Sequence, residues 1–355
     1  MDKNSEKKNI LFVCIGINTG GIERALINIL NIIDYSKYNV DLLLWNVNGD
    51  LYKFLNPSVN VIDGIKYRVK SMSELKKQFS LVECLRYLLF ILFNYIGIPW
   101  KIFRKIKKNY DIAIAFSHYD YSPIFVLDKV CSLKKYLWFH NGKYIFSKKQ
   151  HNINKKIYRK FDKVICVSEA VYDELKKFFP NNNNFVIRYN DIDKDSIIKQ
   201  SLEFNPDFDK NKINIVTVGR LFQDKGIDIA LACAKRLLAE NYDFIWYFVG
   251  DGGMRKEYEE YIVSNNLNKN CILLGSKSNP YPYMKCANIY VQPSRIESFG
   301  LTVTEAMILN KFIIASSVKA LEEQLKSYNN SILCDINADS MFISIKSTID
   351  NYLYK

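Results

Sequence analysis

Three stretches of this sequence share one design, in which a continuous apolar run leads into a glycine-containing loop and then an amphipathic helix. The first apolar run is 9–15, and it is followed by a glycine loop at 16–21 and by apolar residues at helical spacing within 22–33. Residues 213–226 and 244–253 begin in the same way. Continuous apolar runs are typical of parallel strands that are buried on both faces. The design therefore predicts an α/β fold with parallel sheets.

The length of the chain suits two domains. Its 355 residues are enough for two separate hydrophobic cores. A polar, proline-containing stretch at 200–212 has little apolar periodicity and is predicted to be a linker. The expected domains are therefore 1–199 and 213–339, each a Rossmann-like, doubly wound parallel sheet.

Composition narrows the classes of partner. The net charge of +13 favours either nucleic acid or an anionic membrane surface. No zinc-finger, RNP or helix-turn-helix pattern accompanies the lysines, so no nucleic-acid partner is expected. The eight cysteines show no C-x-x-C and no paired histidine spacing, which disfavours a zinc site or a disulfide framework. Residues 1–8 are polar and do not have the pattern of a secretory signal peptide.

The stretch 294–307 is the strongest candidate for a binding site. An apolar run at 287–291 precedes it and predicts a strand, and helical spacing follows it. Gly300 allows close approach of a ligand, and the start of a helix favours phosphate. Glu297 in the loop and Glu305 in the helix would flank such an anion, which suits the hydroxyl groups on either side of a diphosphate. The alternative is a solvated loop acid and an acid that compensates the helix dipole.

Two cations follow the first strand of the second domain. Gly219 ends that apolar run, and Arg220 and Lys225 come before the next predicted helix. Arginine binds phosphate through a planar fork and lysine as a point charge, so the pair is a candidate diphosphate site. Two solvated side chains are the alternative.

Together these segments resemble the E-x7-E and V-G-R-L…K-G motifs of the retaining family four of glycosyltransferases. The resemblance implies the GT-B fold, in which two Rossmann-like domains face a cleft. It also implies that Arg220 and Lys225 hold the donor diphosphate, Glu305 the ribose hydroxyls and Glu297 the sugar hydroxyls. By the same resemblance, the remaining donor-binding residues are Gly20, Gly21, Gly219, Gly250, Gly252, Gly275, Ser276, Phe299, Gly300, Leu301 and Thr302.

Histidines end two apolar runs of the first domain. His118 and His140 follow predicted strands, and ligands gather at the carboxyl ends of parallel strands. A structural role is the alternative for either residue. The pair His140-Asn141 resembles the strand-end histidine of the family, so the resemblance adds His140 to Glu297, Arg220 and Lys225 as a catalytic candidate.

Asp191 and Asp193 form a D-x-D, a pattern that binds a metal ion in some other glycosyltransferases. Here the segment resembles the N-G-[IV]-D strand exit of the family, with Asp191 in place of the usual glycine. We therefore predict a turn, with no metal ion and no cofactor, the nucleotide-sugar being a substrate.

The segment 81–108 is the least polar part of the chain. Residues 87–100 are almost entirely apolar, but this stretch is shorter than the approximately 20 residues that span a bilayer. A basic cluster follows at 101–108. The segment is either an interfacial element on anionic lipid or a helix packed on the sheet with a solvated basic end.

The agreement with the family weakens after Met307. The strand at 310–315 lacks the common Gly-x-Pro, and 317–320 lacks the usual following glycine pair, which leaves the donor sugar open. The last helix of the family crosses back onto the first domain, and residues 340–355 could do the same.

The resemblance thus predicts a metal-independent, retaining hexosyltransferase. It would move a hexose from a nucleotide-sugar, by family resemblance a UDP-sugar, to a lipid-linked or polysaccharide glycan, at the cytoplasmic face of the cell membrane. Two alternatives stay open, a non-catalytic membrane-associated scaffold and a sugar-nucleotide epimerase of similar fold. A scaffold need not retain all four charged residues, Arg220, Lys225, Glu297 and Glu305.

Overall fold

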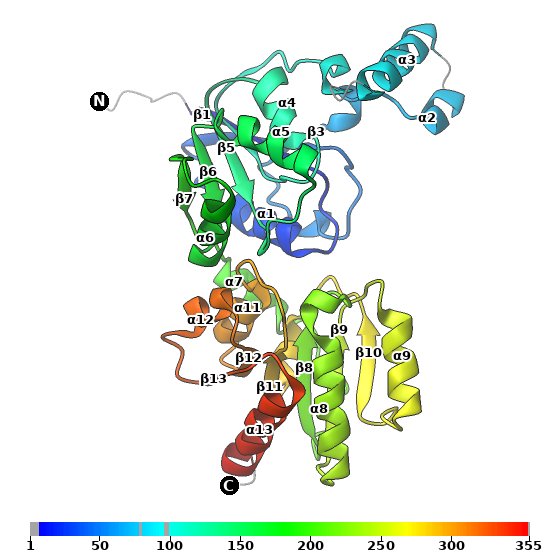
Figure 1. Cartoon of the computed structure of the whole chain (residues 1–355), viewed down its shortest axis with the longest axis vertical. Helices are drawn as coiled ribbons and strands as arrows, with labels where there is room; N and C mark the ends of the chain where they lie inside the picture. The colour runs from blue at the N-terminus through cyan, green and yellow to red at the C-terminus, as the bar shows by residue number, and fades with distance from the viewer. Residues whose placement is uncertain (1–6, 78–79, 96–98, 354–355) are drawn as a thin grey trace. The chain divides into compact units, whose positions relative to one another are not determined.

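Two separate parallel sheets organise the chain, as the computed structural model shows (Figure 1). The structure describes residues 7–77, 80–95 and 99–353. Unit 1 comprises residues 1–140 and 144–192, and unit 2 comprises 141–143 and 193–355. The prediction of an α/β chain with parallel sheets is confirmed.

Unit 1 is built around a parallel sheet with the strand order β3-β2-β1-β4-β5-β6-β7. Strands β1 to β3 are added toward one edge of the sheet and strands β4 to β7 toward the other. The position between β1 and β4, where this strand order reverses, is the topological switch point of a doubly wound sheet. Its strands are β1 (Lys8–Cys14), β2 (Tyr38–Leu44), β3 (Asn60–Asp63), β4 (Asn109–Ala115), β5 (Cys131–Phe139), β6 (Lys163–Cys166) and β7 (Phe185–Ile187). Its helices are α1 (Gly21–Ile32), α2 (Met72–Lys77), α3 (Leu81–Tyr95), α4 (Ser122–Lys129), α5 (Lys148–Tyr158) and α6 (Glu169–Phe178), with the short turns η1 (Tyr52–Phe54), η2 (Gly64–Lys66) and η3 (Pro99–Ile102).

Unit 2 repeats this topology with the order β10-β9-β8-β11-β12-β13. Its strands are β8 (Ile213–Val218), β9 (Phe244–Val249), β10 (Cys271–Gly275), β11 (Ile289–Gln292), β12 (Phe312–Ser316) and β13 (Ser331–Cys334). Its helices are α7 (Lys194–Gln200), α8 (Ile227–Ala239), α9 (Arg255–Ser264), α10 (Tyr281–Cys286), α11 (Leu301–Ile308), α12 (Lys319–Leu325) and α13 (Ala338–Thr348), with the short elements η4 (Gln223–Lys225) and η5 (Ile349–Leu353).

Trp246 lies in the centre of the unit 2 core. The side chain is fully buried, and its ring stacks on Phe248 with centroids 5.5 Å apart. Its indole N–H donates to Thr217 Oγ1 at 3.0 Å, and that hydroxyl donates to the Val291 carbonyl at 2.8 Å. These bonds join β9, β8 and β11 and satisfy the polar atoms that burial removes from water.

The stretch expected to be a linker belongs to unit 2. The amide of Asn279 donates to the Gln200 carbonyl at 2.9 Å and to the Glu203 carboxylate at 2.8 Å. Phe208 stacks on Tyr247 with ring centroids 4.0 Å apart. The division between the units therefore lies at 192/193, upstream of α7. The sequence pattern did not reveal this because the contacts join residues that are far apart along the chain.

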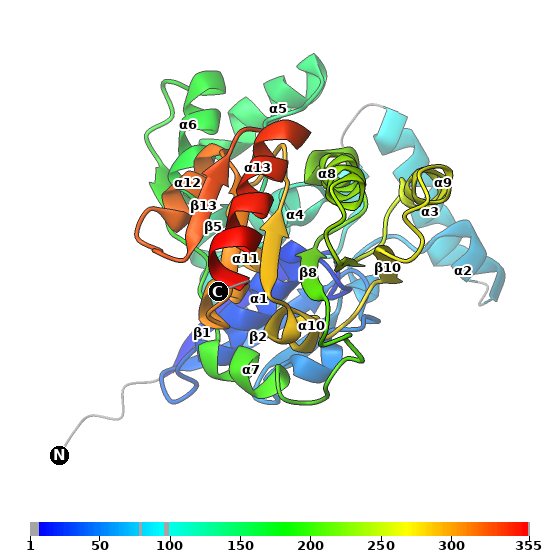
Figure 2. The ribbon, with the colours of Figure 1, turned by 90° about the horizontal axis from the view of Figure 1, so that it is seen from below.

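The C-terminal helix α13 also packs on unit 2, beside α8 (Figures 1 and 2). Met341, Phe342 and Ile345 are buried in the core of unit 2, and the Arg236 guanidinium lies 4.0 Å from the Phe342 ring centroid. The apolar face of this helix is thereby used within unit 2, to which residues 340–353 belong. Residues 354–355 of the predicted returning helix lie outside the described part of the chain.

The helix α3 covers most of the apolar segment that was predicted to contact either the sheet or lipid. Along this helix Leu81, Leu85, Leu88, Leu92 and Tyr95 are 57–89% exposed, so this face does not pack on the sheet. Residues 96–98 of the segment lie outside the described residues. Within the described part of the chain, no helix is both long enough and apolar enough to cross a bilayer.

Two glycines after β9 give a matched test of the backbone at this sheet edge. Gly250 has φ +151°, and a Cβ there would lie 1.8 Å from the Gly219 carbonyl oxygen. A Cβ on Gly253 would meet only the Phe222 ring, at 3.4 Å. We expect Gly250→Ala to lower the free energy of unfolding by at least about 2 kcal/mol, because the backbone must move.

We expect Gly253→Ala to change the free energy of unfolding by less than about 1 kcal/mol, because its Cβ has room. Denaturant unfolding of the two variants and the parent protein checks this pair. Equal stability of the two variants would contradict the described geometry.

Candidate functional site

The loop after β8 and the loop after β11 approach each other closely in unit 2. Gly226, which immediately precedes α8, has φ +65°, and a Cβ at this position would lie 1.9 Å from the Pro293 carbonyl oxygen. The backbone amides of Arg295 and Ile296 both donate to the Asp224 carbonyl, at 2.8 and 3.2 Å. Only glycine fits such an approach at positive φ. The approach brings the end of η4 to the stretch that carries Glu297.

A largely buried ion pair forms where these loops meet. The Lys225 ammonium donates to Glu297 Oε1 at 2.7 Å, and the side chains are 17% and 8% exposed. The Ser294 hydroxyl donates to the same oxygen at 2.7 Å, and the Gln292 amide donates to it at 3.2 Å. The structure thus brings together Lys225 and Glu297, two residues predicted separately from the sequence.

Gln292 is the centre of the polar network under this pair. Its side-chain nitrogen donates to Ser294 Oγ at 2.8 Å. Its side-chain oxygen accepts from Tyr290 OH at 2.5 Å and from Thr302 Oγ1 at 3.1 Å. Ser294 lies in the predicted stretch 294–307 but was not singled out there, and Gln292 was missed, although a glutamine ending an otherwise apolar strand was an available signal.

Arg295 fixes the loop from the side of α8. Its guanidinium donates twice to the Asp228 carboxylate, at 2.6 Å each, and once to the Gln223 carbonyl at 3.0 Å. The hydrogen bond with Asp228 raises the pKa of Arg295. Neither Arg295 nor Asp228 was predicted, and each is a positioning residue for the loop that holds Glu297.

Gly300 and Glu305 lie at opposite ends of the first turns of α11. Gly300 has φ +84° and precedes the helix, and a Cβ there would lie 2.6 Å from a Leu321 methyl. Leu301 and Thr302 form the first turn, where unpaired amides favour an anion. Glu305 is buried, 2% exposed, and accepts a hydrogen bond from the Tyr281 hydroxyl at 3.0 Å.

Apart from Phe299, the other predicted residues of unit 2 lie at the carboxyl ends of β8, β9 and β10. The Gly219 amide donates to the Val249 carbonyl at 3.0 Å, and the Gly250 amide donates to the Gly275 carbonyl at 3.0 Å. A Cβ on Gly252 would lie 2.5 Å from the Leu221 carbonyl oxygen. Ser276 follows β10 directly, and Phe299 is buried before α11.

Arg220 is the most exposed of the predicted charged residues of unit 2. Its side chain is 64% exposed, lies 3.6 Å from the Asp224 carboxylate and stands over the Phe222 ring at 5.3 Å. It belongs to the same loop as Lys225 but not to the hydrogen-bond network of Glu297. This guanidinium is therefore accessible to solvent, unlike the Lys225 ammonium.

The predicted histidines of unit 1 are buried. His118 and His140 are each 7% exposed, and the His140 amide lies 3.5 Å from His118 Nδ1. Among the residues that the structure describes, none hydrogen-bonds to the Nε2 atom of either ring. Burial lowers the pKa of His140 to about 3, although a hydrogen bond with the Phe116 backbone acts in the opposite direction. Burial, together with the neighbouring His140, lowers the pKa of His118 well below its usual value. Gly20 and Gly21, the remaining predicted residues of unit 1, stand at the start of α1.

The two carboxylates of the D-x-D have protein partners. Asp191 pairs with Arg188 at 2.8 Å, and Asp193 caps α7 by accepting from the Ser196 amide at 3.0 Å. Among the described residues, no group of three or more His, Cys, Asp or Glu side chains is arranged to hold a metal ion.

Comparison with known protein families identifies the part of the chain that carries this network. Residues 198–352 match the family model of glycosyl transferases group 1. Arg220, Lys225, Glu297 and Glu305 all lie inside the matched residues. The predicted resemblance to glycosyltransferases is confirmed for this part of the chain, whereas family four and the retaining mechanism stay predictions.

Curated relatives extend the similarity over about two thirds of the chain. The uncharacterized glycosyltransferases MJ1178 and MJ1059 of Methanocaldococcus jannaschii are 28% and 26% identical to it and align with 69% and 62% of it. These alignments span 67% and 61% of the relatives themselves. A Campylobacter jejuni protein, N-acetylgalactosamine-N,N'-diacetylbacillosaminyl-diphospho-undecaprenol 4-alpha-N-acetylgalactosaminyltransferase, is 25% identical over 55% of the chain and 53% of its own length.

Solved structures establish the fold. Anabaena HepE in complex with UDP and glucose superposes with a TM-score of 0.72 at 17% identity, covering 98% of this chain and 91% of that one. With two doubly wound parallel sheets in the same chain, the protein has the GT-B fold. This confirms the predicted fold class.

The buried histidines predict how stability depends on pH. Because the folded pKa of His140 is about 3 and the unfolded value is about 6.5, the unfolded chain binds the proton first as pH falls. The contribution of the neutral His140 ring to the free energy of unfolding is therefore fully present above about pH 6.5. It is lost progressively as the pH falls from about 6.5 to about 3.

We expect His140→Phe, which keeps a ring against Phe116, to reduce the slope of unfolding free energy with pH by up to about 1.4 kcal/mol per pH unit between about pH 6 and pH 4. Denaturant unfolding of parent and variant from about pH 4 to pH 8 measures both slopes. Parallel slopes would show that His140 is not the buried neutral group described.

Proposed function

We propose that this chain is a metal-independent, retaining glycosyltransferase that moves a hexose from a UDP-sugar to a hydroxyl of a lipid-linked or polysaccharide glycan. The observation that carries the proposal is the Lys225–Glu297 pair, which combines a cation and a carboxylate in one buried network. The start of α11 lies in the same network, through the bond of Thr302 to Gln292. A sugar diphosphate needs these three kinds of group, a cation, amide donors and a hydroxyl acceptor.

The donor assignment has support from the matched family and from the fold. Residues 198–352 match glycosyl transferases group 1, and a structural neighbour with the same fold was crystallised with UDP and glucose. In our proposal Arg220, Lys225 and the amides of Gly300 to Thr302 bind the diphosphate. Glu305, whose Oε1 is oriented by Tyr281, accepts from the ribose hydroxyls.

The ion pair suits a site that must bind a phosphate and a sugar side by side. A lysine ammonium has three N–H donors, and Glu297 uses one of them here. Lys225 can therefore donate to a donor phosphate while it keeps Glu297 in place. Glu297, which Ser294 also orients, then accepts from sugar hydroxyls and orients the ring.

In the proposed reaction, negative charge develops on the leaving diphosphate as the hexose is transferred. The bond between the anomeric carbon and the leaving phosphate oxygen breaks, the electron pair stays on the diphosphate, and the acceptor oxygen bonds to the same face of that carbon. The leaving phosphate oxygen takes the proton of the acceptor hydroxyl. Preorganised cations and amides lower this barrier because they stabilise the charge that forms on the diphosphate. For His140 we keep the role implied by the resemblance, beside the donor sugar.

The acceptor class has support from one relative. The printed name of the Campylobacter jejuni protein describes a sugar transfer to a diphospho-undecaprenol glycan. A glycan carried on a lipid is presented at a membrane, so we place the protein at the cytoplasmic face of the cell membrane.

Lysine substitutions test the proposed donor site. We expect Lys225→Ala to lower kcat/KM for transfer from a UDP-hexose by about 100-fold or more, because the leaving diphosphate loses a preorganised cation. Lys256→Ala on α9, where the side chain is 88% exposed, is the matched control and should keep the parent rate. Product formation is measured by chromatography across a panel of UDP-sugars, with circular dichroism to verify folding.

An equal rate for Lys225→Ala and Lys256→Ala would refute the donor site. Two further readouts test the proposed retaining mechanism and the proposed independence of metal ions. The anomeric configuration of the product, determined by NMR, should match that of the donor, and inversion would refute the retaining mechanism. Addition of EDTA should leave the rate unchanged.

A further inference from the structure

The helix α3 of unit 1 turns its apolar face outward. Leu81, Leu85, Leu88, Leu92 and Tyr95 recur at helical spacing and are 75%, 59%, 63%, 57% and 89% exposed. Val82, Leu89 and Ile91 extend the same face. Contiguous apolar surface of this kind marks an interaction site, because a helix of a soluble domain normally buries such a stripe. We call these eight residues the α3 patch.

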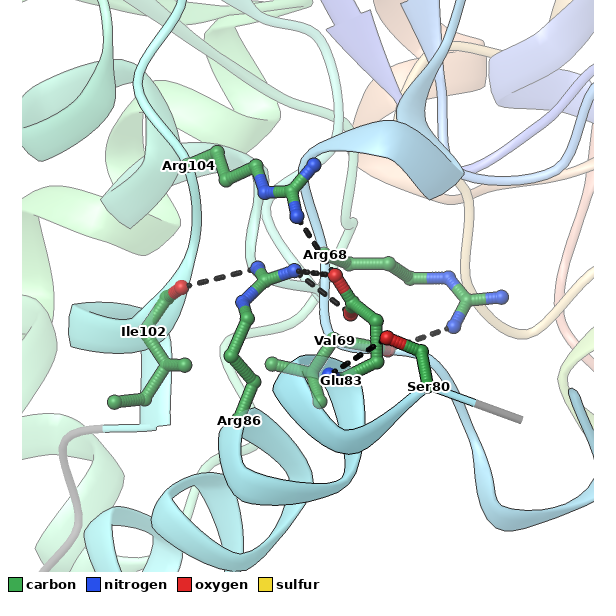
Figure 3. A network of polar contacts seen from close by, with 7 residues as sticks. All are labelled: Arg68, Val69, Ser80, Glu83, Arg86, Ile102 and Arg104. Atoms are coloured by element: carbon green, nitrogen blue, oxygen red, sulfur yellow. Dashed lines mark hydrogen bonds and ion pairs between the residues drawn. The ribbon is translucent and has the colours of Figure 1, made fainter. Parts of the chain in front are cut away.

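A polar network holds the helix in this orientation (Figure 3). Glu83 is buried on the face opposite the α3 patch, and its carboxylate accepts from Arg86 at 2.8 Å and from Arg104 at 2.7 Å. Arg86 also donates to the Ile102 carbonyl at 3.3 Å. The charged side chains of α3 thus bind the segment before β4, which leaves the apolar residues to face away from it.

Exposed basic residues lie on or next to the segments that pack against α3, which are α2 and η3. Arg104, which reaches Glu83, is followed by exposed Lys105 and Lys107. Lys76 of α2 is exposed as well, and α2 packs against α3. The whole chain carries a net charge of +13. The chain on both sides of α3 therefore carries exposed positive charge.

We propose that the α3 patch docks on the surface of an anionic lipid bilayer. The helix would lie in the interface with its leucines among the acyl chains, while Lys105 and Lys107 contact lipid headgroups. The helix has 15 residues, which suits lying in the interface and not spanning it. This inference concerns unit 1 and stands apart from the donor chemistry of unit 2.

Charge favours lipid over a second copy of the chain as the occupant. Two copies joined through the α3 patch would bring the basic residues of both copies together, and like charges repel. Anionic headgroups instead complement the lysines. A bilayer also accepts a convex row of aliphatic side chains without needing a matching groove.

Vesicle flotation with the full chain tests the proposal. We expect binding to vesicles of phosphatidylcholine with about one third phosphatidylglycerol, and binding weaker by at least about tenfold to pure phosphatidylcholine. The variant Leu85→Glu/Leu88→Glu/Leu92→Glu should lose binding to both by at least about tenfold. The matched control, Val263→Glu/Ile343→Glu, changes two side chains of unit 2 that are each 62% exposed, and should bind like the parent.

A charge variant tests the role of the lysines separately. Lys105→Glu/Lys107→Glu should weaken binding to the anionic vesicles by about tenfold or more and leave binding to phosphatidylcholine unchanged, and about 0.5 M salt should weaken the parent protein similarly.

The proposal is overturned if the parent protein stays unbound, if the triple glutamate variant binds like the parent, or if the α3 patch instead mediates a dimer in light scattering. The thermal shift caused by UDP should be the same in the parent, the triple glutamate variant and the lysine variant, because these substitutions leave unit 2 untouched. A normal UDP shift with no vesicle binding rejects the docking surface alone, and vesicle binding without a UDP shift rejects the donor site alone.

Discussion

The Lys225–Glu297 ion pair is the interaction on which the organisation of unit 2 depends. Two charges that are 17% and 8% exposed are costly to bury, and they are stable only when hydrogen bonds surround them. Ser294 and Gln292 supply those bonds to Glu297. The close approach at Gly226 explains how the two loops come near enough for the pair to form. In the donor site that we propose, these hydrogen bonds would orient the charged groups before a ligand arrives, as electrostatic catalysis requires.

The two units place unusual side chains for different reasons. In unit 2, buried charges are satisfied by a dense network at the carboxyl ends of the strands. In unit 1, helix α3 has the opposite of the usual arrangement of polar and apolar side chains. Glu83 and Arg86 face inward, while leucines of the same helix face solvent. Soluble folding alone does not favour either arrangement. Each is explained if the protein binds a charged donor at one unit and a lipid surface at the other.

Much of the fold could be predicted from the sequence, because strands and helices of this kind leave local patterns of apolar residues and glycines. Apolar runs followed by glycine marked β8 and β9, and the spacing of charged residues marked Lys225 and Glu297 as candidates. Their mutual ion pair was not predictable, because it joins positions 72 residues apart. The sequence showed that 87–100 is almost entirely apolar but not which face of α3 is exposed, because the contact of Arg104 with Glu83 comes from outside the helix. The packing of 200–212 on unit 2 was missed because the partner of Phe208 is Tyr247, on β9.

A crystal structure of the protein with UDP tests the central claim most directly, that the network around Lys225 and Glu297 is the donor site. We predict that a diphosphate oxygen lies within about 3.2 Å of the Lys225 ammonium and that another phosphate oxygen accepts from the first amides of α11. UDP bound elsewhere on the chain, with Lys225 and the start of α11 free of phosphate, would contradict the account.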